Sequence, residues 1–170
     1  LQKTNFQIPH WYTEALAVRE EGGGLSDDWQ ELLLNRVPRG EVFNLTTLNG
    51  GFQRPRDGDD WQMAYCQSFL YSEYFVERFG EAALTKLLDA YCTTRETDVA
   101  VRQAYGVELA DLETGYAEFL AKTVDGLQAQ RSPRRPTLEA AKAAHEADMS
   151  DLDAAGRYAL ALQNAEQFKS

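Results

Sequence analysis

Apolar residues recur with helical spacing along almost the whole chain, which predicts an all-α fold. Between about residues 59 and 79 they cover most of the helix circumference, which is typical of a buried central helix. Gly80 and Gly106 lie where helices are expected to end. The clearest i, i+3, i+4, i+7 stripe is formed by Leu84, Leu87, Leu88 and Tyr91. Further helices are expected at about 11–21, 26–35, 98–105 and 109–120, and Ser26-Asp27-Asp28 is typical of the N-cap of the second of these.

Residues 38–58 interrupt this helical pattern. Gly50, Gly51 and Pro55 are typical helix breakers, while Phe43 and Phe52 are among the apolar residues that can anchor the segment. The sequence therefore predicts a long irregular loop packed against the core. Loops of this length are more often functional than idle.

The C-terminal part of the chain differs in composition. Residues 131–136 hold three arginines and two prolines, which favours a linker over an anion site. We therefore expect a main domain at 1–130 and a helical pair at 137–170, with helices at 138–148 and 152–168. Its second helix is expected to bury Leu152, Ala155, Ala159 and Leu162. The pair resembles the start of a tetratricopeptide array, but one pair does not establish a 34-residue period, so a simple helical cap is an equal alternative.

Composition and charge exclude several classes of function. The 170 residues are 44% hydrophobic, enough for one compact domain and a small appendage. A net charge of −10 argues against binding of nucleic acid or an anionic membrane surface, because both require clustered Lys and Arg. No apolar run approaches the roughly 20 residues of a membrane span. Cys66 and Cys92 fall in helical patterns and are expected to be a pair of buried thiols rather than a disulfide or metal site.

Glu14 is the most informative ionisable residue. It lies in a helical segment beside apolar residues that include Trp11, Ala15 and Leu16. A carboxylate buried in such surroundings needs a cation or hydrogen-bond donors. The alternative is a glutamate at the N-terminal turn that interacts with the helix dipole and faces water.

The residues alone define no complete catalytic constellation. The chain has no GxSxG, no phosphate-binding glycine loop, no CxxC and no HExxH. His10 and His145 are far apart in sequence and are expected to be structural or solvated. On residue chemistry alone the sequence supports an acidic, all-helical domain.

One segment adds more. The run Ile8-Pro9-x-Trp11-x-x-Glu14-x-Leu16-Ala17 resembles the segment of gluzincin zinc metallopeptidases (peptidase MA clan) that supplies the third metal ligand. The resemblance is to bacterial families whose catalytic domain precedes tetratricopeptide repeats, and it covers roughly residues 8–120. It extends to Ala64-Tyr65-Cys66-Gln67-Ser68, to residues 74–80, and to Gly106 with Leu112-Glu113. It implies the helical C-terminal subdomain of such a peptidase.

The resemblance assigns roles to two residues. Glu14 corresponds to the zinc ligand that completes a His2Glu site with the two histidines of HExxH, leaving a fourth position for water. Tyr65 corresponds to the tyrosine that donates a hydrogen bond to the oxyanion. The alternative for Tyr65 is one more aromatic residue in an aromatic-rich helix, in which case Tyr71 would take the role.

The chain departs from the family pattern in two ways. Ala15 replaces the usual glycine, and HExxH is absent although it should lie roughly twenty residues before the ligand, whereas only thirteen residues precede Glu14. We therefore expect a fragment of a zinc-dependent peptidase with a protein or peptide substrate, HExxH lying upstream. The chain alone should hold no zinc and be inactive. The alternatives are a dead peptidase scaffold and a non-catalytic module that binds a protein partner through its C-terminal helices.

Overall fold

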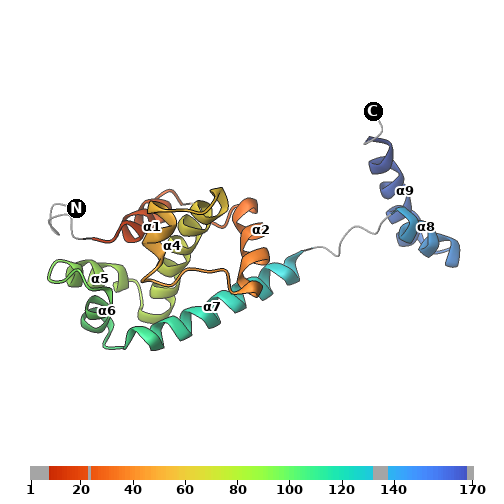
Figure 1. Cartoon of the computed structure of the whole chain (residues 1–170). Coiled ribbons are helices and arrows are strands. Elements are labelled where there is room, and N and C mark those ends of the chain that lie inside the picture. Colours follow the sequence, from red (N-terminus) through yellow and green to blue (C-terminus); the bar gives the residue numbers. More distant parts are fainter. Residues whose placement is uncertain (1–7, 23, 132–137, 168–170) are drawn as a thin grey trace. The chain divides into compact units, whose positions relative to one another are not determined.

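The computed structural model describes residues 8–22, 24–131 and 138–167, without the side chains of 157, 160, 161 and 163–167. All regular secondary structure in these residues is helical, which confirms the predicted fold class (Figure 1). The chain divides into two compact units, Leu1–Leu127 and Gln128–Ser170. The described residues contain no helix that is long and apolar enough to cross a membrane. Most of the predicted linker at 131–136 lies outside the described residues, so the predicted boundary stays a prediction.

Helix α4 (Gly58–Phe79) is the centre of the first unit. Asp57 caps its start by accepting the N–H of Asp60 at 2.8 Å, and the chain leaves it at Gly80, whose φ of 83° suits a residue without Cβ. Buried residues occupy most of its circumference, as the sequence predicts. Trp61 is an exception, because 42% of its surface is exposed.

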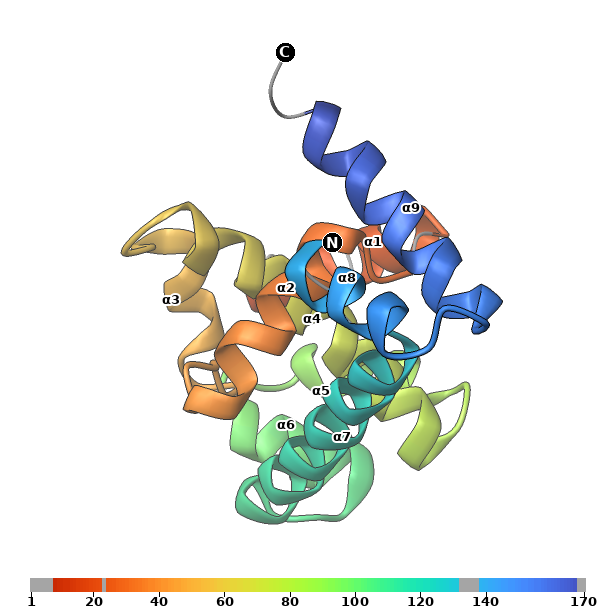
Figure 2. The same ribbon diagram turned by 90° about the vertical axis from the view of Figure 1, so that its right-hand side faces the viewer.

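Helices α1 (His10–Glu20) and α2 (Asp27–Arg36) pack against α4. The fully buried Trp11 and Ala15 belong to the face of α1 that enters the core. The hydroxyl of Ser26 accepts the N–H of Trp29 and caps α2, as predicted. The two views in Figures 1 and 2 show α1 and α2 (both orange to red) beside α4.

The predicted irregular loop contains a helix, so that part of the prediction is wrong. After a short 3₁₀ helix, η2 (Val37–Arg39), the side chain of Asn44 accepts the N–H groups of Thr46 and Thr47, and this turn leads into α3 (Leu48–Gln53). Gly51 acts here as a packing residue: a Cβ on it would lie 2.7 Å from the Cβ of Ala64 in α4. The glycine that suggested a break in the helix instead allows close contact between two helices.

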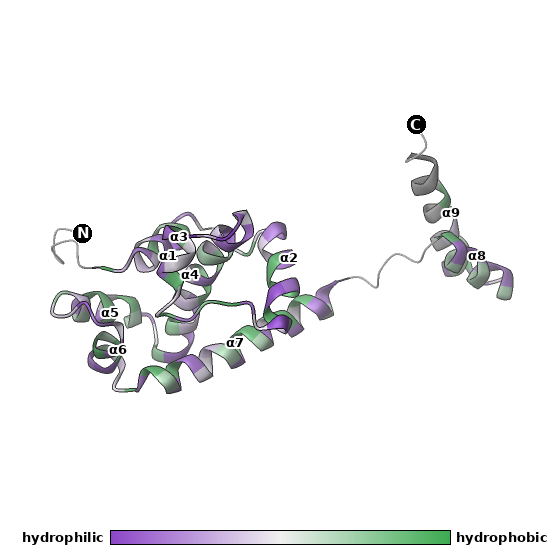
Figure 3. Cartoon of the chain, viewed as in Figure 1, coloured by the Kyte–Doolittle hydropathy of each residue, from purple (hydrophilic) through white to green (hydrophobic). Residues whose placement is uncertain are grey.

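Helices α5 (Ala83–Tyr91) and α6 (Thr97–Tyr105) form a packed pair, which is followed by α7 (Leu109–Gln130). Figure 3 shows apolar and polar residues alternating along α7, as expected for a helix with one buried face. Its buried residues are Leu112, Tyr116, Leu120 and Val124.

Two packing predictions are wrong. Cys66 is buried but Cys92 is exposed, because it is the C-cap of α5 where the chain leaves the core; both are free thiols. In the second unit, helices α8 (Leu138–Ala147) and α9 (Leu152–Gln167) pack together, and Ala141 and Ala154 are the buried residues among the side chains described there. The predicted stripe does not form, and Leu152 is 85% exposed.

Candidate functional site

Glu14 lies at the edge of the buried face of α1. It is the fifth residue of that helix, and the first turn contains no acidic residue. The favourable effect of the helix dipole falls off within the first turn, so it does not account for Glu14. The side chain of Glu14 is 23% exposed. Of its neighbours on the helix, Ala15 is fully buried and Ala17 is exposed. Glu14 is thus neither a solvated surface residue nor part of the core.

Tyr65 lies on α4, and its phenol is close to the carboxylate of Glu14. Burial raises the pKa of its phenol above the ordinary value of 10.0, and the negative charge of the Glu14 carboxylate and a hydrogen bond to it raise that pKa further. Two aromatic rings hold Tyr65 in place by edge-to-face contacts, with Phe52 at 5.0 Å and Trp61 at 4.6 Å between ring centroids. The phenol therefore remains a protonated hydrogen-bond donor at neutral pH.

Glu14 and Tyr65 line one pocket of about 360 Å³. The segments that contribute to it are α1 with its C-cap, α2 and α4, and the remaining lining residues are Ala17, Val18, Glu21, Trp29, Trp61 and Gln62. The structure thus brings together the two residues to which the family resemblance assigns a metal-binding and a catalytic role, although they are 51 positions apart. Sequence reasoning missed Trp29, Trp61 and Gln62, because their helical positions indicate core or surface without showing which of them meet at a pocket.

His10 adds a polar contact to Glu14. Its Nε2 lies 3.3 Å from a carboxylate oxygen of Glu14, one helical turn away, and its ring packs edge-on against Phe52 at 4.8 Å. The imidazole is half exposed. His10 is thus partly solvated and contacts the candidate ligand, Glu14.

The start of α1 is held by α3. The side-chain oxygen of Asn49 accepts the N–H of Trp11 at 3.1 Å, which satisfies a helix N-terminal donor that no residue of α1 itself satisfies. Phe52, on the same short helix, contacts both His10 and Tyr65. Helix α3, which the sequence pattern does not predict, therefore contacts the candidate site through Phe52.

The donor set can be tested against zinc. Glu14 offers a carboxylate oxygen at a pocket wall, which suits one zinc ligand. No group of three or more His, Cys, Asp or Glu side chains in the described part of the chain could hold a metal ion. The described residues of the pocket can therefore supply one zinc ligand, Glu14, and the other ligands of a zinc site would have to come from elsewhere.

Tyr71 is committed to the core and does not line this pocket. Its hydroxyl donates to a carboxylate oxygen of Glu113 at 2.7 Å, and its ring stacks on Tyr116. The other oxygen of Glu113 accepts the N–H of Leu45 at 2.9 Å. Glu113 thus joins α4, α7 and the segment before α3.

Gln67 makes a second tie to the same segment. Its side-chain oxygen accepts the N–H of Phe43 at 2.7 Å, and its side-chain nitrogen donates to the carbonyl of Phe43 at 2.8 Å. Because Gln67 is fully buried, these bonds satisfy polar groups that would otherwise be costly. They fix the segment that leads into α3.

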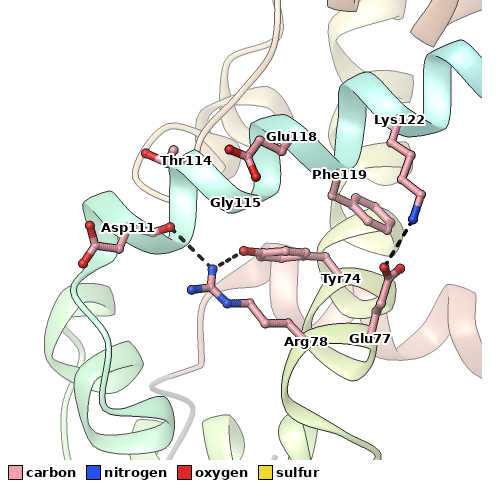
Figure 4. Close-up of a pocket in the computed structure, with 9 residues that line it drawn as sticks. All are labelled: Tyr74, Glu77, Arg78, Asp111, Thr114, Gly115, Glu118, Phe119 and Lys122. Carbon is pink, nitrogen blue, oxygen red and sulfur yellow. Dashed lines mark hydrogen bonds and ion pairs between the residues drawn. The ribbon is translucent and has the colours of Figure 1, made fainter.

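A larger pocket of about 560 Å³ lies between α4 and α7 (Figure 4). Arg78 donates there to the hydroxyl of Tyr74 and to the carbonyl of Asp111, while Lys122 is paired with Glu77 at 3.9 Å. Both cations of this pocket thus already have partners in the protein. Neither Glu14 nor Tyr65 lines it.

Taken together, the described helices define an all-α domain with a carboxylate and a tyrosine in one pocket. The family model described as the Peptidase MA superfamily matches residues 2–122. The chain therefore belongs to the Peptidase MA superfamily. No curated protein and no solved structure matches the chain significantly.

Proposed function

We propose that this chain forms the helical part of a zinc-dependent peptidase, in which Glu14 is the third metal ligand and Tyr65 the oxyanion-stabilising donor. The observation that supports this most directly is the shared pocket of Glu14 and Tyr65. Membership of the Peptidase MA superfamily is consistent with a protein or peptide substrate. In this proposal the HExxH histidines and the general-base glutamate come from a segment that precedes Leu1 in a longer protein, and the 170-residue chain alone is inactive.

Each residue would have a distinct task. Bound zinc would supply Lewis acidity toward the scissile carbonyl. Glu14 would contribute one carboxylate oxygen from the wall of the pocket. Tyr65, whose phenol is protonated at neutral pH, would donate a hydrogen bond to the negative charge that develops on the carbonyl oxygen. The edge contacts from Phe52 and Trp61 would keep that donor in position.

The test uses an extended protein that includes the segment upstream of Leu1. Zinc content and peptide hydrolysis are measured in the wild type, in Glu14→Gln and in Glu20→Gln, which changes an exposed carboxylate on the same helix. Loss of a residue that only hydrogen-bonds to a metal ligand lowers metal affinity by roughly 10- to 100-fold. Because Glu14 is proposed to bind the metal directly, we expect Glu14→Gln to lower the affinity for zinc by more than that. Glu20→Gln should retain both zinc and activity.

The alternatives give different results in the same assay. A Glu14→Gln protein with full zinc content would remove Glu14 from the ligand set. An extended wild-type protein that folds but holds no zinc would favour a dead scaffold or a non-catalytic interaction module. The exposed Met149 and Leu152 of the second unit favour the interaction module as second candidate.

A further inference from the structure

The pocket of Glu14 and Tyr65 adjoins a second pocket. This one has a volume of about 390 Å³ and lies between α2 and the N-terminal end of α4. Trp29 and Gln62 line both pockets, and the indole N–H of Trp29 donates to the side-chain oxygen of Gln62 at 3.0 Å. This bonded pair belongs to the lining of both pockets, so the two pockets adjoin each other.

The charges along the two pockets have one sign. Glu14 and Glu21 line the first, and Asp28 and Asp59 are among the residues that line the second. None of the described residues that line either pocket is Lys or Arg. The α4–α7 pocket of the same domain contains both signs, so the acidic net charge of the protein does not impose this arrangement everywhere. A cationic ligand is favoured here.

The walls are aromatic as well as acidic. Trp29 and Trp61 both line the first pocket, and Trp61 is one of the large apolar side chains that the domain leaves exposed. Indole rings attract cations over their faces and cover the aliphatic stem of Lys or Arg. Carboxylates beyond such a surface suit the charged end of the same side chain.

The carboxylates of the two pockets do not form a complete metal site by themselves. The described residues contain no group of three or more acidic, His or Cys side chains that could hold one. Charges distributed over two adjoining pockets instead match a ligand that extends along both.

We propose that these two pockets bind a peptide segment that carries a Lys or Arg side chain, which makes basic peptides the substrate class of the site. This rests on the proposed function for cleavage and deepens it, while the binding itself can be measured without catalysis. Trp29 and Trp61 contact the stem of the basic side chain, and Asp28 and Asp59 contribute to the attraction of its charge.

The test measures binding to this 170-residue chain. The probes are the blocked pentapeptide Ac-Ala-Ala-Lys-Ala-Ala-NH2 and its norleucine analogue, which keeps the aliphatic stem and lacks the charge. We expect the lysine peptide to bind about tenfold more tightly, equivalent to about 1.4 kcal/mol. The double variant Asp28→Asn/Asp59→Asn should reduce the preference to less than about threefold, and added salt should reduce it in the wild type.

A matched control removes two charges elsewhere. Glu118→Gln/Asp125→Asn changes two exposed carboxylates of α7 and should keep the preference for lysine. Equal binding of the two peptides, no measurable binding of either, or an equal loss of preference in the control variant overturns the proposal.

Hydrolysis by the extended protein separates this inference from the proposed function. Preferential binding of the lysine peptide by an extended protein without peptidase activity would support the binding of basic peptides and contradict the proposed peptidase function. Hydrolysis of the lysine and norleucine peptides at equal rates would retain the enzyme and remove the inference.

Discussion

Tyr65 and Tyr71 show how two tyrosines of one helix acquire different roles. The phenol of Tyr65 reaches the pocket that holds Glu14, whereas the phenol of Tyr71 is hydrogen-bonded to Glu113 in the core. Helical periodicity placed both on a largely apolar helix and could not distinguish between them. The difference arises from what α1 and α7 bring to each position.

Under the proposed function, this difference predicts the behaviour of two variants of the extended protein. Tyr65→Phe should lower kcat by roughly 10²- to 10³-fold, because it removes one donor to the developing oxyanion, while zinc content stays unchanged. Tyr71→Phe should leave kcat nearly unchanged and lower the free energy of unfolding by about 1–3 kcal/mol, because an acceptor atom of Glu113 loses its donor. An unchanged kcat for Tyr65→Phe, measured at saturating peptide, would remove Tyr65 from catalysis.

Asp60 is the residue on which the start of α4 depends electrostatically. Its side chain is 3% exposed and accepts hydrogen bonds from the buried Arg36 and from the Nε, Nη2 and backbone N–H of Arg56. The bond from Arg56, followed by that from Arg36, outweighs burial and holds the pKa of Asp60 well below its ordinary value of 3.8. The ionised carboxylate therefore stabilises the folded state above about pH 4, and this contribution is lost as the pH falls through the lowered pKa.

Asp60→Asn should accordingly destabilise the protein in a pH-dependent way. Near pH 7 we expect a loss of about 3–5 kcal/mol, because Arg36 is left as a buried charge without its main partner. The difference from the wild type should shrink as the pH is lowered below 4. Urea unfolding at several pH values measures this, with the neighbouring exposed Asp59→Asn as a control expected within about 0.5 kcal/mol of the wild type. A constant difference at all pH values would contradict the assignment.

At the scale of elements, α3 depends on one glycine and tolerates change at the next. A Cβ on Gly51 would lie 2.7 Å from the Cβ of Ala64 and 2.9 Å from the ring of Phe43, whereas a Cβ on Gly50 would meet nothing within 4 Å. The two positions therefore form a matched pair within one short helix.

Gly51→Ala should destabilise the domain by about 1–3 kcal/mol through overpacking between α3 and α4. Gly50→Ala should be neutral or stabilising by up to about 1 kcal/mol, because alanine favours the helix. Since Phe52 contacts Tyr65, only Gly51→Ala should also shift the aromatic NMR signals of Tyr65. Equal unfolding free energies for the two variants would contradict the close contact.

The elements that the sequence predicts correctly are determined by residues close to them in the chain. Ser26 as a cap, Gly80 as a stop and the apolar circumference of α4 depend on neighbours within a few positions. The misses depend on distant partners. Gly51 resembles a helix breaker until its contact with Ala64 is known. Leu152 resembles a core residue by its spacing, but it is exposed, whereas Ala141 and Ala154 are buried.

The same reasoning explains what was predictable about the candidate site. Glu14 and Tyr65 could be named from a resemblance in sequence, but the pocket that they share requires α1, α2 and α4 to pack together. Trp29, Trp61 and Gln62 could not be assigned to it, because helical periodicity gives a face and not a partner.

At the scale of the whole molecule, the two units differ in how much core they have. The first unit buries large side chains such as Trp11, Tyr71, Phe75 and Tyr91. Hydrogen bonds from the side chains of Gln67 and Glu113 to the backbone also connect its elements. Among the described residues of the second unit, the buried ones are Ala141 and Ala154. Apolar burial is the main stabilising contribution to folding, so the first unit should supply nearly all of the stability of the chain.

A chain that ends at Gln130 should therefore unfold cooperatively with a Tm close to that of the 170-residue protein. We expect a difference smaller than the roughly 4–8 °C that 1 kcal/mol represents for a small domain. The peptide 131–170 should be only partly helical alone, because isolated short helices are marginal in water and the side chains described in this unit bury little apolar surface. Scanning calorimetry of the shortened chain and circular dichroism of the peptide measure both. A shortened chain that melts without cooperativity would mean that the second unit completes the core of the first.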